Sequence, residues 1–168
     1  TGEEGDCTYP DAGYSCLADD FGNHYPLDFE FEQSTQQAFY FITTVTLDGV
    51  AIENDNDWVG AFNGDVCVGA RLWESDREET CAGGVCDVPV MGVDTTLSDM
   101  TESYMQTGDI PTFKIYDASE DIYYNAVVIG GFTDFDGNII SGAWFNSGFY
   151  LAFKLQNEIL GCTDLDAC

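Results

Sequence analysis

The chain has 168 residues, 45% hydrophobic and 14% aromatic, and carries 31 Asp and Glu against four Lys and Arg, a formal net charge of −27. This length suits one domain with a sizeable core, and the aromatic content excludes a disordered acidic tail. The charge excludes nucleic acid as a partner, because carboxylates and phosphates repel. It also disfavours anionic membrane surfaces, and no stretch approaches the ~18 apolar residues of a membrane-spanning helix, so membrane insertion is not expected.

The first third of the chain begins irregularly and then becomes strand-like. Residues 1–24 are rich in Gly, Asp and Cys, which predicts an irregular, disulfide-pinned cap. Residues 27–32 alternate apolar and acidic side chains, the period of a half-buried strand. Residues 37–47 are a run of β-formers, and Asp48-Gly49 after them is a hairpin-type turn signal.

The middle of the chain predicts one hairpin and one long loop. Residues 58–62 and 65–73 are apolar runs joined by Asn63-Gly64, the strongest local hairpin signal. The acidic, cysteine-bearing stretch 74–86 predicts a loop. Residues 88–90 predict a short edge strand, where the proline at 89 is tolerated.

The last third predicts one short helix within 94–107 and three strands. Residues 111–116 and 122–129 form a second predicted hairpin. Residues 148–156 form the final predicted strand. Four side chains are expected to share one face of it: Phe149, Leu151, Phe153 and Leu155.

Many short strands with turn signals between them indicate an all-β fold, a β-sandwich of about seven to ten mostly antiparallel strands with Cys/Asp-rich irregular ends. The predicted organisation is a Cys/Asp-rich cap at 1–24 and a β-sandwich domain at 25–160. Residues 161–168 have the composition of the cap and are predicted to begin a further Cys/Asp-rich linking repeat.

The seven cysteines indicate an oxidising compartment. They are Cys7, Cys16, Cys67, Cys81, Cys86, Cys162 and Cys168. They lack the Cys-x-x-Cys pairs expected of a zinc site, so extracellular disulfides are the better interpretation. Cys81 and Cys86 are close enough in sequence to form a short loop. The other pairings stay open, and the odd count leaves one thiol free or paired with another chain.

The two ends resemble halves of one motif. Gly-Cys-Thr-Asp-Leu-Asp-Ala-Cys at 161–168 resembles the opening of a short repeat, and residues 5–10 and 13–16 resemble its closing half. That repeat occurs in very large secreted proteins of environmental, Bacteroidetes-type bacteria. Residues 57–70 and 108–118 resemble a companion domain of the same proteins. The resemblance implies an exported, repetitive protein of the cell surface.

This order of halves, closing first and opening last, predicts how copies are arranged. Either the chain is one period of an array, or separate subunits join head to tail, a heterologous contact that builds open filaments. We therefore expect an extracellular structural module of a filament, sheath or surface adhesin. Its partners would be copies of itself or neighbouring modules, held by strand addition at a sheet edge that the sequence does not identify.

Calcium is the expected cofactor, because clustered Asp and Asn on turns supply the oxygen ligands that it prefers. The candidate ligands lie in three clusters: Asn54, Asp55 and Asp57; Asp134, Asp136 and Asn138; and Asp164 and Asp166. None of these clusters matches an EF-hand. The alternative for each is a plain turn, in which Asp, Asn and Gly are common anyway.

The sequence gives little support for an enzyme. His24 is the only histidine, and no nucleophile elbow or His-Glu-x-x-His motif accompanies it. The alternative function is a calcium-dependent carbohydrate-binding module that takes surface glycans. Trp73 and Trp144 would then be the platforms that stack on sugar rings, and burial in the core is the competing interpretation for both.

Overall fold

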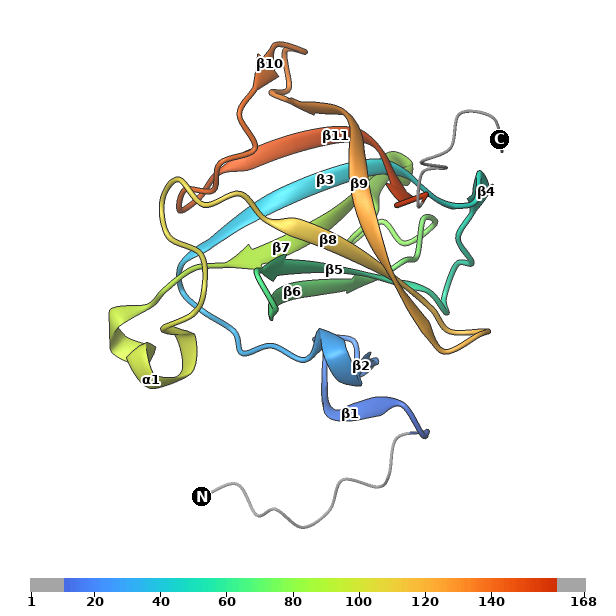
Figure 1. Cartoon of the computed structure of the whole chain (residues 1–168), viewed down its shortest axis with the longest axis horizontal. Coiled ribbons are helices and arrows are strands. Elements are labelled where there is room, and N and C mark those ends of the chain that lie inside the picture. Colours follow the sequence, from blue (N-terminus) through green and yellow to red (C-terminus); the bar gives the residue numbers. More distant parts are fainter. Residues whose placement is uncertain (1–10, 160–168) are drawn as a thin grey trace, which may run out of the picture.

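The computed structural model describes residues 11–159 (Figure 1). The short helical segments are η1 (Leu27–Phe29), η2 (Ala82–Gly84), η3 (Thr95–Leu97) and α1 (Ser98–Thr101). The strands are β1 (Tyr14–Ala18), β2 (His24–Pro26), β3 (Gln37–Leu47), β4 (Val50–Ala51), β5 (Trp58–Asn63), β6 (Val66–Leu72), β7 (Cys86–Met91), β8 (Thr112–Asp117), β9 (Ile122–Thr133), β10 (Ile139–Ile140) and β11 (Phe149–Asn157). The described residues therefore confirm the predicted all-β class.

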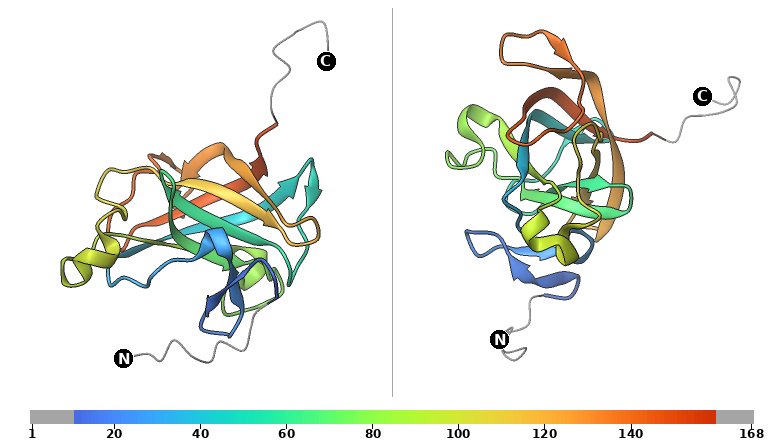
Figure 2. Two further views of the ribbon diagram at one scale, coloured as in Figure 1. Left: turned by 60° about the horizontal axis from the view of Figure 1, so that its bottom comes forward. Right: turned by 90° about the vertical axis from the view of Figure 1, so that its left-hand side faces the viewer.

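Nine of these strands form one sheet, in the order β4-β3-β11-β9-β8-β5-β6, with β7 paired to β3 and β10 paired to β9. Every pairing is antiparallel except that of β11 with β3. The sheet curls on itself (Figure 2), so that its inner side encloses the core as in a sandwich. Strands β1 and β2 form a separate hairpin that lies below this sheet in Figure 1.

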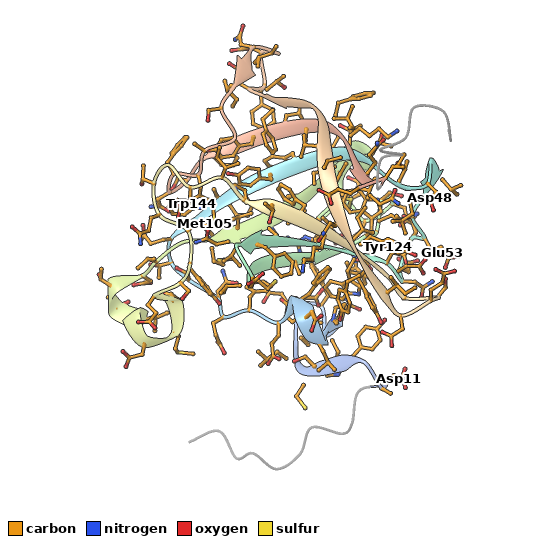
Figure 3. All side chains as sticks on the ribbon, viewed as in Figure 1. Asp11, Asp48, Glu53, Met105, Tyr124 and Trp144 are labelled. Atoms are coloured by element: carbon orange, nitrogen blue, oxygen red, sulfur yellow. A yellow bond between two sulfur atoms is a disulfide. The ribbon has the colours of Figure 1, made fainter. Side chains whose placement is uncertain are left out.

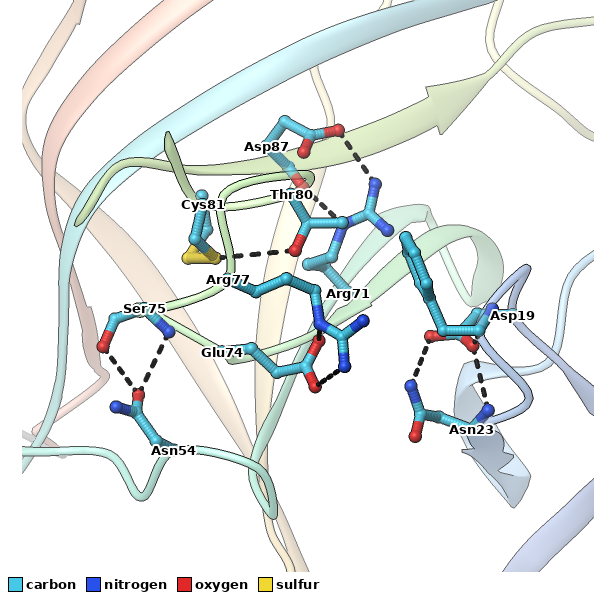
Figure 4. Close-up of polar contacts among 12 residues, drawn as sticks. Asp19, Asn23, Asn54, Arg71, Glu74, Ser75, Arg77, Thr80, Cys81 and Asp87 are labelled. Atoms are coloured by element: carbon cyan, nitrogen blue, oxygen red, sulfur yellow. Dashed lines mark hydrogen bonds and ion pairs between the residues drawn. A yellow bond between two sulfur atoms is a disulfide. The ribbon is translucent and has the colours of Figure 1, made fainter. Parts of the chain in front are cut away.

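The curled sheet closes where β6 lies against β7, although these two described strands do not pair as a ladder. Gly69 of β6 sits so close to β7 that an added Cβ would overlap the carbonyl oxygen of Pro89. Arg71 of β6 spans the same seam, donating from Nε to the carbonyl of Asp87 at 2.8 Å and from Nη2 to its carboxylate at 2.9 Å (Figure 4). The seam is therefore closed by close backbone approach and one ion pair.

Aromatic side chains fill the core. Tyr40 of β3 stacks on Tyr150 of β11 with 4.3 Å between ring centroids, and its hydroxyl donates to the carbonyl of Gly142. Trp58 of β5 is 2% exposed and packs against Tyr25 of β2, which joins the small hairpin to the main sheet. Such rings contribute large buried areas and specific edge or stacking contacts.

The strand and turn predictions are largely confirmed. β3 has its predicted bounds, and Asp48 and Gly49 adopt the positive φ of 49° and 83° that a two-residue hairpin turn requires. The hairpins β5–β6 and β8–β9 form as expected. The short helix falls inside 94–107, and β7 is an edge strand around Pro89.

Three local predictions are wrong. Residues 14–26 form a hairpin where an irregular cap was expected, so the predicted boundary at 24 falls inside β2. Residues 27–32 contain η1 and then extended chain without a strand partner, although Phe29 and Phe31 are buried as the alternation predicted. The Phe29 ring packs directly against Gly60 of β5.

The third error concerns β11. The inward side chains include Tyr150 and Ala152, whereas Phe149 and Phe153 of the predicted apolar face point outward, 50% and 74% exposed. Leu155 of the same predicted face is fully buried, because an irregularity in register between Ala152 and Lys154 interrupts the alternation. The four side chains therefore do not share one face.

None of the described helices is long and apolar enough to cross a membrane.

Candidate functional site

The most distinctive surface of the molecule is an outward cluster of phenylalanines on β3 and β11, which we call the phenylalanine face. Its members are Phe39, Phe41, Phe135, Phe149, Leu151 and Phe153. Phe149 stacks on Phe39 and Phe41 at centroid distances of 5.9 and 6.1 Å, with interplanar angles near 20°. Phe135, from the turn after β9, contacts Phe41 and Phe149.

Strand register builds this face. In the parallel pair, Phe149 lies opposite Phe39 and Leu151 lies opposite Phe41. Because neighbouring strands are about 4.8 Å apart, these side chains stand beside one another on the outer surface of the sheet. Phe135 is 67% exposed, so the cluster is open to solvent. The members of the face carry no charge, and Phe135 lies between Asp134 and Asp136 at its edge.

The sequence contains a signal for this face. Residues 38–42 and 149–153 are apolar at every position, whereas a strand with one solvated face alternates. A strand that is apolar on both sides is typical of one covered on both sides. In the described structure Phe135 lies against part of this outer side, and Phe149 and Phe153 remain 50% and 74% exposed.

A groove of about 620 Å³ adjoins the phenylalanine face, between the β1–β2 hairpin and the strands β3, β6 and β7. Phe39 belongs to both surfaces. Gln33, Gln37 and Arg71 supply polar groups to the groove, and Tyr25 supplies an aromatic ring. The Arg71 guanidinium is held by Asp87 at 2.9 Å, so its position in the groove is fixed.

Two side chains of the acidic loop at 54–57, those of Asn54 and Asp57, accept hydrogen bonds from other parts of the chain. The Asp57 carboxylate is buried and accepts hydrogen bonds from the amides of Glu53 at 2.7 Å and Ala118 at 3.0 Å. Asn54 accepts from the amide and hydroxyl of Ser75 (Figure 4). Burial raises the pKa of Asp57 above its ordinary value. The Asp57 carboxylate and the Asn54 side-chain oxygen are therefore engaged in protein hydrogen bonds.

The loop at 134–138 is closed in the same way. Asp134 accepts from the amides of Asp136 and Asn138 and from the Asn138 side-chain amide, all within 3.0 Å. These hydrogen bonds lower the pKa of Asp134. Among residues 11–159, no group of three or more His, Cys, Asp or Glu is placed to hold a metal ion. Asp164 and Asp166 lie outside the described residues, and calcium stays a prediction.

Asp94 is a further buried carboxylate, which the sequence did not single out. It is 4% exposed and accepts from the hydroxyl of Thr35 at 2.6 Å and from the hydroxyl of Thr96 at 2.6 Å. Their amides donate to it as well. These hydrogen bonds hold the pKa of Asp94 well below its ordinary value. Asp94 thereby ties the start of β3 to the segment that contains α1.

The two tryptophans expected as sugar platforms are buried, which corrects that part of the alternative function. Trp73 and Trp144 are each 4% exposed. The Trp144 indole donates to the carbonyl of Val90 at 2.9 Å, and its ring lies beside Met105 at one end of the sheet (Figure 3). Neither ring presents a face to solvent, so neither can stack on a sugar.

The described cysteines show one predicted disulfide, Cys81–Cys86. The disulfide lies at the end of the loop between β6 and β7. The same loop contains the ion pair of Glu74 and Arg77 (Figure 4). Cys16 is not a free thiol. Cys67 is free and buried, and burial raises its pKa to about 12, which keeps it unreactive. Cys7, Cys162 and Cys168 lie outside the described residues.

His24 lies on β2, where it lines a shallow groove together with Asp11 and Asp55. Its Nδ1 is buried and has no hydrogen-bond partner within the described part of the chain. A histidine base in a hydrolase needs a nucleophile and an orienting carboxylate within hydrogen-bond reach. The contacts found at His24 do not form that arrangement.

Comparison with known proteins adds no relative: no family model matches the chain, and neither the curated proteins nor the solved structures contain a significant match.

Proposed function

We propose that the chain is a structural module of an extracellular surface or filament protein, and that it associates with copies of itself or with neighbouring modules through the phenylalanine face. The observation that carries the proposal is the contrast between this uncharged aromatic face and a chain with 31 acidic and four basic residues. Exposed, contiguous apolar surface on a soluble domain marks an interaction site.

Charge explains why this face would be the place of contact. Two copies with a net charge of −27 repel at most relative orientations, and the phenylalanine face is where they approach with the least opposition. Fully burying one phenylalanine side chain contributes about 1.5–3 kcal/mol. Salt screens the repulsion without weakening the apolar contact, so association is expected to strengthen as salt rises.

The rest of the fold suits a passive module. The Cys81–Cys86 disulfide favours an oxidising, extracellular compartment. The β1 hairpin and the end of β11 lie on different sides of the main sheet (Figure 1), so the chain enters and leaves the domain at separate places. Modules with this geometry can be strung together without their sheets obstructing one another.

Sedimentation velocity at low and high salt tests the proposal. The wild type is expected to associate with rising concentration, and more so at high salt. The double variant Phe149→Ser/Phe153→Ser should remain monomeric. Val50→Ser is the matched control, because Val50 is 70% exposed on β4 and lies outside the phenylalanine face. A wild type that is monomeric under every condition, or a double variant that associates normally, refutes the proposed face.

Calcium belongs to the proposal as a stabiliser of acidic junctions. Because Asp57 and Asp134 already accept protein hydrogen bonds, the proposal places the ion on the other predicted ligands of the acidic clusters. A chelator should lower the melting temperature of the whole chain, and re-added calcium should restore it. An unchanged melting temperature would remove calcium from the proposal.

The groove beside Phe39 favours neutral glycan binding as the second candidate function. Glutamine amides and a fixed arginine can orient sugar hydroxyls, and the half-buried ring of Phe39 can contact the apolar face of a sugar. The net charge disfavours acidic glycans. Calorimetric titration with neutral oligosaccharides should show binding that Gln37→Ala weakens and the control Thr43→Ala, on the exposed part of β3, leaves unchanged. No heat with any neutral oligosaccharide would exclude this candidate.

A further inference from the structure

A groove of about 700 Å³ lies between η1, the turn that joins β5 to β6, and α1, and it shares no residue with the phenylalanine face. Figure 1 shows α1 and the segment that follows β2 on the same side of the sheet, below β5 and β6. Phe31, Phe62 and Tyr104 line the groove and are at most 9% exposed. The Tyr104 hydroxyl accepts a hydrogen bond from the amide of Glu32 at 2.7 Å. This bond joins the segment after η1 to the segment after α1 and fixes two walls of the groove.

Three large apolar side chains of the groove are open to solvent. Leu27 of η1 is 53% exposed, Met100 of α1 is 52% exposed and Val66 of β6 is 36% exposed. Single exposed apolar residues are ordinary on a protein surface, but these three come from separate elements and line one groove. Methionine is flexible and polarisable, which suits a surface that adapts to an incoming side chain. The groove therefore offers apolar contacts from three elements at once.

Four carboxylates line the same groove: Asp28, Glu30, Glu32 and Asp65. All four residues are exposed. Within the part of the chain that the structure describes, their side chains form no ion pair and accept no hydrogen bond. Asp94, by contrast, is buried and accepts hydrogen bonds from two hydroxyls. The groove carboxylates are therefore available to a donor from outside the domain.

The one basic residue that lines the groove does not neutralise these carboxylates. Lys114 lies on the ring of Phe62, with 4.6 Å between its Nζ and the ring centroid. Among residues 11–159 it forms no ion pair. Four carboxylates against one ammonium favour a cationic occupant and oppose an anionic one.

A second copy of this sequence is a poor source of such a cation. Its basic residues are Arg71, Arg77, Lys114 and Lys154. Both arginines are already held in ion pairs, and the two lysines are far apart in the sequence. No stretch of the sequence therefore presents several free cations together, so the occupant belongs to a different chain.

We propose that this groove binds a basic, amphipathic segment of another protein, one that combines Lys or Arg with large apolar side chains. Its apolar side chains contact Leu27, Val66 and Met100, and its cations meet the four carboxylates. Exposed ion pairs contribute little affinity each, so the apolar contacts supply most of it and the charges supply orientation and a faster encounter. The proposal does not depend on self-association through the phenylalanine face.

Titration of the whole chain with a fluorescently labelled, amphipathic peptide of leucine and lysine tests the proposal. The peptide should bind, and its affinity should fall as salt rises. Leu27→Ser/Met100→Ser should lower the affinity about tenfold or more, because two apolar contacts are lost. Glu30→Gln/Asp65→Asn should lower it about two- to tenfold. Absence of binding, or an unchanged affinity of Leu27→Ser/Met100→Ser, overturns the proposal.

A matched control separates the groove from the general attraction of a chain with net charge −27. Asp76→Asn/Glu78→Gln makes the same change in net charge at two exposed residues of the loop between β6 and β7, outside the groove. This variant should bind the peptide almost as tightly as the wild type. Equal losses in the control and in Glu30→Gln/Asp65→Asn would mean that the peptide follows net charge alone, which overturns the groove as its site.

This proposal and the proposed function fail separately. Phe149→Ser/Phe153→Ser should bind the peptide normally, and Leu27→Ser/Met100→Ser should still self-associate as the wild type does. If Phe149→Ser/Phe153→Ser loses the peptide and Leu27→Ser/Met100→Ser retains it, the peptide occupies the phenylalanine face and the groove proposal is overturned. A wild type that stays monomeric but binds the peptide in the groove refutes the proposed face and leaves the groove proposal standing.

Discussion

The aromatic residues of this chain fall into a buried group and an exposed group. Trp73 and Trp144, the candidate sugar platforms, are buried, and so is Trp58: all three are below 5% exposed. Phe149 and Phe153, predicted to share one face of their strand with Leu155, are exposed while Leu155 is buried. Residue type therefore indicates how much area an aromatic side chain can bury. It does not indicate on which side of the sheet that side chain lies. Register and the sense of curl decide the side.

The sharpest test of this comparison replaces one ring of the buried group. Trp58→Ala should lower the free energy of unfolding by about 3–5 kcal/mol, because it removes a fully buried indole and leaves a cavity that the sheet cannot close. Chemical denaturation followed by circular dichroism measures the loss. A change below about 1 kcal/mol would mean that Trp58 does not pack between β5 and the β1–β2 hairpin.

The seam of the curled sheet should be the next most sensitive place. Gly69→Ala adds a Cβ that overlaps the Pro89 carbonyl, so β6 and β7 must separate. Overpacking of this kind costs about 1–3 kcal/mol. Gly49→Ala cannot serve as the control, because Gly49 has φ 83° and alanine disfavours that conformation. The control is instead Ala82→Gly in η2. A Gly69→Ala variant as stable as the wild type would show that the seam is loosely packed.

Two buried aspartates should respond to pH in opposite senses. The folded pKa of Asp94 lies below its ordinary 3.8, so its stabilisation is present above that pH and is lost as the pH falls through the folded pKa. The folded pKa of Asp57 is raised, so wild-type stability rises as Asp57 takes up its proton and falls again as the pH increases through that pKa.

Asparagine variants isolate these contributions. The difference in unfolding free energy between wild type and Asp94→Asn should shrink as the pH falls below about 3.8. The corresponding difference for Asp57→Asn should grow in the wild type's favour. Urea titrations at a series of pH values supply both curves. Parallel pH profiles for the two variants would contradict the opposite environments of these carboxylates.

The smallest effect on stability is expected from the exposed aromatic group. Phe153→Ser should change the free energy of unfolding by no more than about 0.5 kcal/mol, because the side chain is already 74% exposed in the folded state. The same substitution should reduce association, measured by sedimentation. A loss of stability comparable to that of Trp58→Ala would mean that the phenylalanine face supports the fold of the monomer.

Local signals in the sequence predicted most of the fold. The β-former run at 37–47, Asp48-Gly49, and the two hairpins around 58–73 and 111–129 follow from nearest neighbours, so they were found with almost correct bounds. The hairpin at 14–26 was missed because its composition is that of a loop. The parallel pairing of β11 with β3 joins residues about 110 positions apart, and no local pattern specifies it.

The candidate site was harder to predict, because it depends on that long-range pairing. Phe39 and Phe149 become neighbours only through the β3–β11 register. The acidic clusters are conspicuous in the sequence. In the structure, however, the carboxylates of Asp57 and Asp134 accept hydrogen bonds from nearby amides. Only the local prediction for Cys81 and Cys86, five residues apart, was directly confirmed.

The parallel pairing also has a mechanical consequence. Strand β3 enters the pair at Gln37 and β11 leaves it at Asn157, with seven residue pairs aligned between these ends. Tension applied at those two ends pulls the strands along one another, so that the connecting hydrogen bonds are strained together. A hairpin such as β5–β6, pulled at its open end, would lose its bonds one after another. Forced unfolding is governed by the unfolding barrier, and a shear geometry raises the force needed to cross it.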